Sequence, residues 1–266
     1  MTEERIVRSI LMSAAVVLGV ASCTPEPLDD NDAGAGGSTT GGTAMGGGAT
    51  AGTATGGNGT GGGQTGFTGF VTRQGLEFRE GAKRHVFVGA NFWQGMNLGM
   101  AGQSGDSARL RRELDRLQAL GVTNVRIMAA SEGPDTAPYR TVPSLMPSPG
   151  VYNEEVFKGL DLFLDDLSRR GIRAVMVLNN YWEWTGGMAQ YVSWGEGTSI
   201  PYRLDPGGDY TTFTRYVDRF YACTSCQTAY RAHIETVIHR VNTVNGRTYR
   251  EDPTLFSWQL ANEPLP

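Results

Sequence analysis

The stretch Asn153–Leu178, NEEVFKGLDLFLDDLSRRGIRAVMVL, joins a helix pattern to a strand pattern. Asn153 is a favourable helix N-cap residue, and Gly171 is a favourable residue just past a helix end. Between them, apolar residues recur with helical spacing at Phe157, Leu160, Leu164 and Leu167. Ile172–Leu178 is then almost continuously apolar, as in a strand that is buried on both faces. The stretch predicts a helix that leads directly into a buried strand.

The same helix-to-strand unit recurs on both sides of this stretch. Upstream, Asp106 or Ser107 can cap a helix, and a strand follows it over Val122–Ala130. The apolar positions of that helix are Leu110, Leu114, Leu117 and Leu120. Downstream, a helix over about Thr228–Val244 precedes a strand over Thr254–Ala261. Three such units in a row are typical of an α/β protein.

Three further strands are predicted ahead of these units. Phe70–Thr72 and Leu76–Phe78 flank Gly75 and predict a small hairpin. His85–Asn91 is more continuously apolar, which predicts a strand buried on both faces. From His85 onward, strands and helices alternate, and this order predicts parallel strands joined by helical crossovers.

The loops of this pattern are unequal in length. Loops that follow strands are long, at 131–152 and 181–227, whereas the loop 245–253, which leads into a strand, is short. In a (β/α)8 barrel the long loops would all lie on the C-terminal face, where such barrels place their sites. A doubly wound sheet is the alternative, but no Gly-x-Gly-x-x-Gly turn follows any predicted strand. A complete barrel has eight strands, so we expect residues 67–266 to be the N-terminal half of one, truncated after its fourth strand.

Residues 1–23 resemble a secretory signal. Arg5 and Arg8 precede an uncharged run from Ser9 to Ser22. The tetrapeptide Val20-Ala21-Ser22-Cys23 resembles the lipobox of bacterial lipoproteins, in which the cysteine is lipidated and becomes the new N-terminus. Cleavage near Ala21 without lipidation is the alternative. We expect a lipoprotein on the outer membrane or cell surface of a bacterium, or outside it.

Residues 24–66 are predicted to be a disordered linker. From Asn31 to Gly66, 16 of 36 residues are glycine, eight are threonine and six are alanine. Such a composition buries too little apolar surface to offset the entropy lost on folding. A flexible coil of this kind would let the folded region extend away from a membrane anchor.

Charge and composition exclude several classes of protein. The net charge of −4 argues against binding to nucleic acid or another polyanion. No apolar run is long enough for a spanning helix, and three Cys and three His are too few for a zinc framework. No metal or other cofactor is expected.

The cysteines suggest one disulfide. If Cys23 carries lipid, Cys223 and Cys226 remain as a pair, which an oxidising compartment would close. A thioredoxin-like redox motif is the rival interpretation, but it needs a strand directly before the first cysteine. Tyr210–Tyr221 lacks the alternation of a strand, so we favour a structural disulfide.

The end of the last predicted strand carries the strongest candidate for catalysis. With period two, Glu263 shares a face with Gln259 and would project into the mouth of a barrel, where a carboxyl group suits general acid catalysis. Asn262 can hydrogen-bond a substrate hydroxyl. A plain Asn-Glu-Pro turn is the alternative. Arg126, on a buried strand, needs a carboxylate partner, either in a structural pair or to hold a catalytic carboxylate.

Aromatic residues cluster in the loops that follow strands. Trp93 follows the first strand of the alternating pattern, and Asn180, Trp182 and Trp184 follow the third. A sugar ring has an apolar face and a polar rim, so indoles beside amides favour carbohydrate binding. For Tyr191 and Trp194, packing inside the protein is an equally good interpretation.

Several linked segments resemble the endo-β-1,4-mannanases of glycoside hydrolase family five. They are Gly150–Phe157, Asn179-Asn180, Gln190–Trp194, Arg240–Thr243, Asp252–Thr254 and Asn262–Pro264. The resemblance implies a (β/α)8 barrel and a retaining double displacement. It also implies that Glu263 is the acid/base, that Arg126 contacts the nucleophile, and that Asn262 binds near the sugar's 2-hydroxyl. The family's nucleophile is a second Glu at the end of strand seven, which this chain does not reach.

We therefore expect a lipid-anchored endo-β-1,4-mannanase that acts on β-mannan and is a monomer when complete. A cellulase or other β-1,4-glycanase on the same barrel is one alternative, and a surface carbohydrate-binding protein without catalysis is another. Because the nucleophile lies beyond the fourth strand, the 266-residue chain alone should not hydrolyse mannan at an enzyme's rate. Arg126 would then lack the carboxylate that it should orient.

Overall fold

A computed structural model describes residues 66–67 and 69–265, which belong to one compact unit, Gly63–Pro266. The expected signal sequence, the lipidation site Cys23 and the linker up to residue 65 lie outside the described residues. None of the described helices is long and apolar enough to cross a membrane.

Four parallel strands form the central sheet, in the order β4-β5-β6-β7. Their bounds are Gly89–Asn91, Asn124–Met128, Arg173–Val177 and Leu255–Gln259. Neighbours in the sheet are also neighbours in the chain, which confirms the predicted alternation of parallel strands and helices. The carboxyl ends of all four strands therefore meet at one edge of the sheet.

Three helices make the crossovers, and local signals set where two of them begin. They are α3 Ser107–Ala119, α4 Glu154–Arg169 and α7 Thr224–Ile238. The side chain of Asp106 accepts from Arg109 N and caps α3, and that of Asn153 accepts from Glu155 N and caps α4. The four predicted apolar residues of α4 are all buried. Leu120 is wrongly predicted to face the core: it lies just past α3 and is 77% exposed.

The N-terminal strands differ from the prediction. β1 Thr72–Gln74 and β2 Glu77–Glu80 form the expected hairpin, but β3 Lys83–Arg84 adds a third antiparallel strand. Only 89–91 of the predicted strand 85–91 joins the parallel sheet, as β4. Val86 is 73% exposed and Val88 is 61% exposed, because β4 lies at the edge of the sheet. The expectation of burial on both faces is wrong for this strand.

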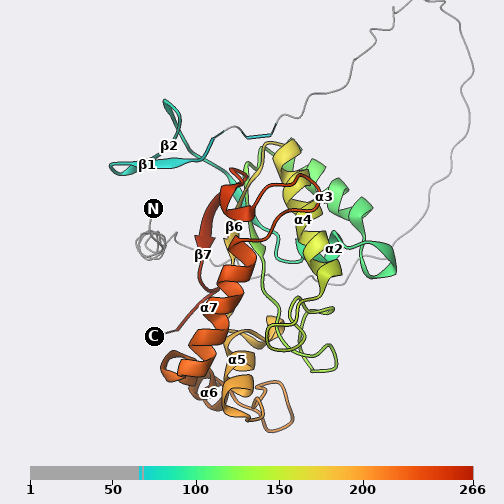
Figure 1. The fold of residues 1–266 in the computed structure, drawn as a ribbon, viewed down its shortest axis with the longest axis vertical. Coiled ribbons are helices and arrows are strands. Elements are labelled where there is room, and N and C mark those ends of the chain that lie inside the picture. The colour runs from blue at the N-terminus through green and yellow to red at the C-terminus, as the bar shows by residue number, and fades with distance from the viewer. Residues whose placement is uncertain (1–65, 68, 266) are drawn as a thin grey trace, which may run out of the picture. The chain divides into compact units, whose positions relative to one another are not determined.

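The segment between β6 and α7 is not the structureless loop that was predicted. It holds a 3-10 turn, η2 Glu183–Thr185, and two helices, α5 Gly187–Glu196 and α6 Tyr210–Ala222. Figure 1 shows α5 and α6 at the end of this unit opposite the β1–β2 hairpin. The predicted helix 228–244 begins earlier, at Thr224, and ends at Ile238.

The expected disulfide joins Cys223 and Cys226 at the start of α7. The element before it is helix α6 and not a strand, which removes the thioredoxin-like interpretation. Helix α5 packs directly on this pair, because a Cβ at Gly195 would lie 2.6 Å from Cys226 Sγ. The disulfide thus lies where α5 meets the start of α7.

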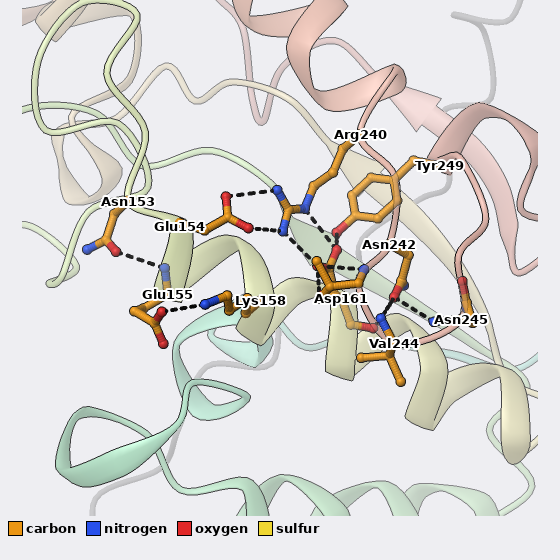
Figure 2. A network of polar contacts seen from close by, with 11 residues as sticks. Asn153, Glu154, Glu155, Lys158, Asp161, Arg240, Asn242, Val244, Asn245 and Tyr249 are labelled. Carbon is orange, nitrogen blue, oxygen red and sulfur yellow. Dashed lines mark hydrogen bonds and ion pairs between the residues drawn. The ribbon is translucent and has the colours of Figure 1, made fainter.

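A polar network joins α4 to the segment after α7 (Figure 2). Asp161 is fully buried and accepts from Arg240 Nε at 2.9 Å, from Arg240 Nη2 at 2.7 Å and from Tyr249 Oη at 2.5 Å. Arg240 also pairs with Glu154, at the start of α4. The chain beyond Ile238 leaves the helix and returns to α4 through these contacts, which explains why α7 stops before Val244.

Candidate active site

Arg126, in β5, donates to two amide side chains at the end of β7. Its Nε lies 2.7 Å from Gln259 Oε1, and its Nη2 lies 2.9 Å from Asn262 Oδ1. Burial lowers the pKa of the Arg126 guanidinium, and the Glu263 carboxylate acts in the opposite direction. We expected Arg126 to lack the carboxylate that it should orient, and within the described residues neutral amide oxygens accept its hydrogen bonds instead.

The loops after β6 and β7 are joined beyond the ends of the strands. Asn262 N donates to Asn179 O at 2.9 Å, and Tyr181 N donates to Asn262 O at 3.0 Å. The side chains continue this pairing, since Asn262 Nδ2 donates to Asn180 Oδ1 at 2.9 Å. Asn180 and Asn262 are both buried. Two amides that the sequence assigned to sugar binding therefore also hold the two loops together, and their contacts with a sugar stay a prediction.

Glu263 follows Asn262 and carries an exposed side chain. Its Oε2 accepts a hydrogen bond from Trp182 Nε1 at 2.5 Å. Its backbone φ is +47°, in the left-handed region, and β7 already ends at Gln259. The alternation of the strand therefore does not decide where Glu263 points. The turn after Ala261 and the contact with Trp182 decide it.

Trp93 and Trp184 form a second part of the candidate site. Their rings meet edge to face, with 5.3 Å between the centroids. They line a cleft of about 810 Å³ together with Gln94, Asn97 and the segment 139–142. Trp184 packs on the buried Met128, Ala130 and Val177 at the ends of β5 and β6. Arg126, Asn262 and Glu263 are not in the lining of this cleft, so the predicted site residues form two groups.

A buried carboxyl group fixes the loop after β5 against α5. Glu132 is fully buried, and its Oε2 accepts from Gly187 N at 3.0 Å. Burial raises the pKa of Glu132 to about 8, against the opposing hydrogen bond from Gly187 and the charge of Arg140. Arg140 donates to the Glu132 carbonyl at 2.5 Å and to Tyr202 Oη at 2.7 Å. These contacts connect the long loop after β5 to the segment after β6.

Three residues of the segment after β6 are buried or packed inside the protein. Glu183 is 2% exposed and pairs with Arg203 at 2.7 Å. Tyr191 is fully buried in the core, and Trp194 packs against it. For these two aromatic residues, packing inside the protein is the correct interpretation.

Sequence reasoning missed two features of the site, although signals for both were present. Gln259 lies on the predicted inner face of the last strand, where its amide oxygen can accept from Arg126. Helix α6, which packs on Trp182, has helical spacing in its buried residues, which are Phe213, Tyr216, Val217 and Phe220.

Residues 68–266 match the family model described as GH family 5 beta-mannosidase-like. The chain belongs to glycoside hydrolase family 5. Its four parallel strands and their helices are those of the N-terminal half of the (β/α)8 barrel of this family. Within that barrel, Arg126 lies inside the second strand, and Asn262 and Glu263 follow the fourth.

Known family 5 proteins show similarity over the same region. The chain is 34% identical over 197 residues to mannan endo-1,4-beta-mannosidase 1 of Arabidopsis thaliana, covering 74% of this chain and 42% of that protein. The family 5 mannosidase of Rhizomucor miehei is 43% identical with a TM-score of 0.71, covering 77% of this chain and 50% of that one. The endo-1,4-beta-mannanase of the same fungus is 26% identical with a TM-score of 0.56, covering 74% and 49%. The chain thus spans about half the length of the relatives that it matches.

Proposed function

We propose that the protein hydrolyses β-1,4-mannosidic linkages within mannan-type polysaccharides by a retaining mechanism. The observation that carries this proposal is the contact of Arg126, inside one strand of a family 5 barrel, with Asn262 and with the charge of Glu263, which both follow another strand. The similarity to a plant mannan endo-1,4-beta-mannosidase supports mannan as the substrate and cleavage inside the chain.

In this mechanism Glu263 protonates the leaving oxygen and later removes a proton from the attacking water. A second carboxylate, about 5–5.5 Å from the first, attacks the anomeric carbon. Arg126 supplies a fixed positive charge beside these groups, because Gln259 and Asn262 hold its guanidinium. Asn262 accepts from Arg126 with Oδ1 and donates with Nδ2 to Asn180, so its amide orientation is determined.

The test is the release of reducing sugar by the complete gene product from galactomannan and from carboxymethylcellulose. We expect activity on galactomannan and a loss of about 10²-fold or more in Glu263→Gln, the range that general acid catalysis contributes. Preference for carboxymethylcellulose would favour a cellulase. Binding of mannan without hydrolysis would favour a carbohydrate-binding protein.

A mannosidase that removes single mannosyl residues from chain ends is the second candidate. It is favoured by the higher similarity to the Rhizomucor miehei mannosidase, at 43% identity, than to the endo-mannanase of that fungus, at 26%. The products decide between the two candidates. An endo-acting enzyme lowers the viscosity of mannan quickly and releases mixed oligosaccharides, whereas a mannosidase releases mannose with little change in viscosity.

We also propose that the protein is exported and lipid-anchored through Cys23, and that it is a monomer when complete. The basic start, the uncharged run and the Val-Ala-Ser-Cys tetrapeptide support export and lipidation. Cys23→Ala should move the protein from the membrane fraction to the soluble fraction. Retention of that variant in the membrane fraction would show that another feature anchors it.

A further inference from the structure

The geometry points to Trp182 as a positioning residue that orients the carboxyl group of Glu263 for proton transfer. This inference rests on the proposed function of Glu263 as the acid/base. The contact that carries it is the hydrogen bond from Trp182 Nε1 to Glu263 Oε2, at 2.5 Å. It joins the loop after β6 to the loop after β7.

The backbone of Glu263 needs such a contact. Glu263 and Tyr139 are the non-glycine residues with positive φ in the described part of the chain. A left-handed backbone at such a residue persists only where the surrounding structure holds it, and it is frequent at active sites. The paired backbones at Asn179 and Asn262 hold the residue before it. Trp182 holds its side chain.

The indole itself is held from several sides. The ring of Phe213, in α6, is nearly parallel to it at 6.3 Å, and the ring of Tyr210 lies at 5.7 Å. The guanidinium of Arg203 lies 5.6 Å from the indole ring and is paired with the buried Glu183. Helix α6 and this ion pair therefore fix the direction in which the indole N–H points.

The chemistry of the contact gives the two carboxyl oxygens different roles. An indole N–H only donates and does not titrate, so Trp182 cannot itself transfer a proton. Its hydrogen bond occupies Oε2 as an acceptor and favours Oε1 as the oxygen that carries the proton in the acid form. Within the described residues, Oε1 accepts no hydrogen bond. The protonated oxygen is thus the one left free for the leaving group.

Dependence on the leaving group tests this role. A sugar leaving group departs as an alcohol and needs protonation of its oxygen by the general acid. A 2,4-dinitrophenolate is stable as an anion and departs without this proton. We expect Trp182→Phe, in the complete gene product, to lower kcat/KM for mannobiose about tenfold or more, within the range of general acid catalysis. For 2,4-dinitrophenyl β-mannoside, the drop should be smaller than about twofold. Trp194→Phe is the matched control, because it removes an indole that packs on Tyr191 instead, and its effects on the two substrates should be equal.

An equal loss on both substrates in Trp182→Phe would overturn the inference, because a defect in folding or sugar binding has no leaving-group dependence. The contact is also tested without activity, by the indole N–H signals of the 15N-labelled 266-residue chain, which has five Trp. Glu263→Gln should move the signal that Trp182→Phe removes, and an unmoved signal would overturn the contact. A product that hydrolyses no mannoside at all would instead refute the proposed function.

Discussion

Replacing Asp161 with asparagine should destabilise the fold strongly, because it removes a buried charge that several groups share. Asp161 is fully buried and accepts from Arg240, Tyr249 and Thr243. Hydrogen bonds to charged groups contribute about 1.5–3 kcal/mol, and breaking a buried ion pair costs about 3–5 kcal/mol. Glu154 still neutralises part of the Arg240 charge in the variant, so we expect a loss of about 3 kcal/mol.

For a folded region of this size, 1 kcal/mol shifts Tm by about 2–4 °C, so Asp161→Asn should lower Tm by about 6–12 °C. Urea unfolding and thermal scans measure both quantities. Glu155→Gln is the matched control on the same helix. Glu155 pairs with Lys158 at 2.8 Å, both side chains are exposed, and its replacement should change stability by about 0.5 kcal/mol or less (Figure 2). An Asp161→Asn variant as stable as this control would refute the assignment of Asp161 as the centre of the network.

Three further predictions concern pH, the disulfide and the guanidinium in the site. Burial raises the pKa of Glu132 to about 8, so the folded state keeps a proton that the unfolded chain has lost, and stability should fall as pH rises from about 4.5 to 8. Glu132→Gln should make stability depend less on pH between about pH 7.5 and 8. In this range His233, whose pKa burial lowers to about 4, is neutral in the folded state and mostly neutral in the unfolded chain, and an unchanged slope would contradict the assignment. Thiol labelling of the native protein should find Cys223 and Cys226 unreactive, and reduction should cost less than about 3 kcal/mol because the closed loop is short; two freely reactive thiols would refute the pairing. Arg126→Lys should lower kcat of the complete gene product about 10²-fold with little change in Tm, because a lysine lacks the planar guanidinium that donates to both amides in fixed directions; a large loss of Tm would indicate a structural role instead.

The elements predicted correctly are those whose signals lie within a short stretch of chain. The apolar stripe of α4, its cap at Asn153 and the buried strand after Gly171 all lie in one continuous segment. The pair Cys223 and Cys226 is equally local. The identity of Glu263 and Arg126 as candidate site residues also came from the sequence, because parallel strands bring their carboxyl ends to one edge of a sheet.

The wrong predictions concern segments whose burial depends on residues far away in the chain. His85–Val88 has the composition of a buried strand, but its burial depends on a neighbour on the far side of β4. The segment 181–227 contains α5 and α6, and most of their aromatic residues face the core instead of solvent, namely Tyr191, Phe213, Tyr216 and Phe220. Composition alone does not distinguish an aromatic residue that meets a sugar from one that meets another helix.

By itself, the sequence determined the alternation of helices and parallel strands, and with it the edge at which Arg126, Asn262 and Glu263 meet. That alternation follows from the periodicity of apolar side chains, which is a property of neighbouring residues. Only the tertiary structure decided which atoms meet at that edge. The amides that accept from Arg126, and the indole that donates to Glu263, lie 81 or more residues away from these partners along the chain, so their geometry depends on how the strands and α6 pack together.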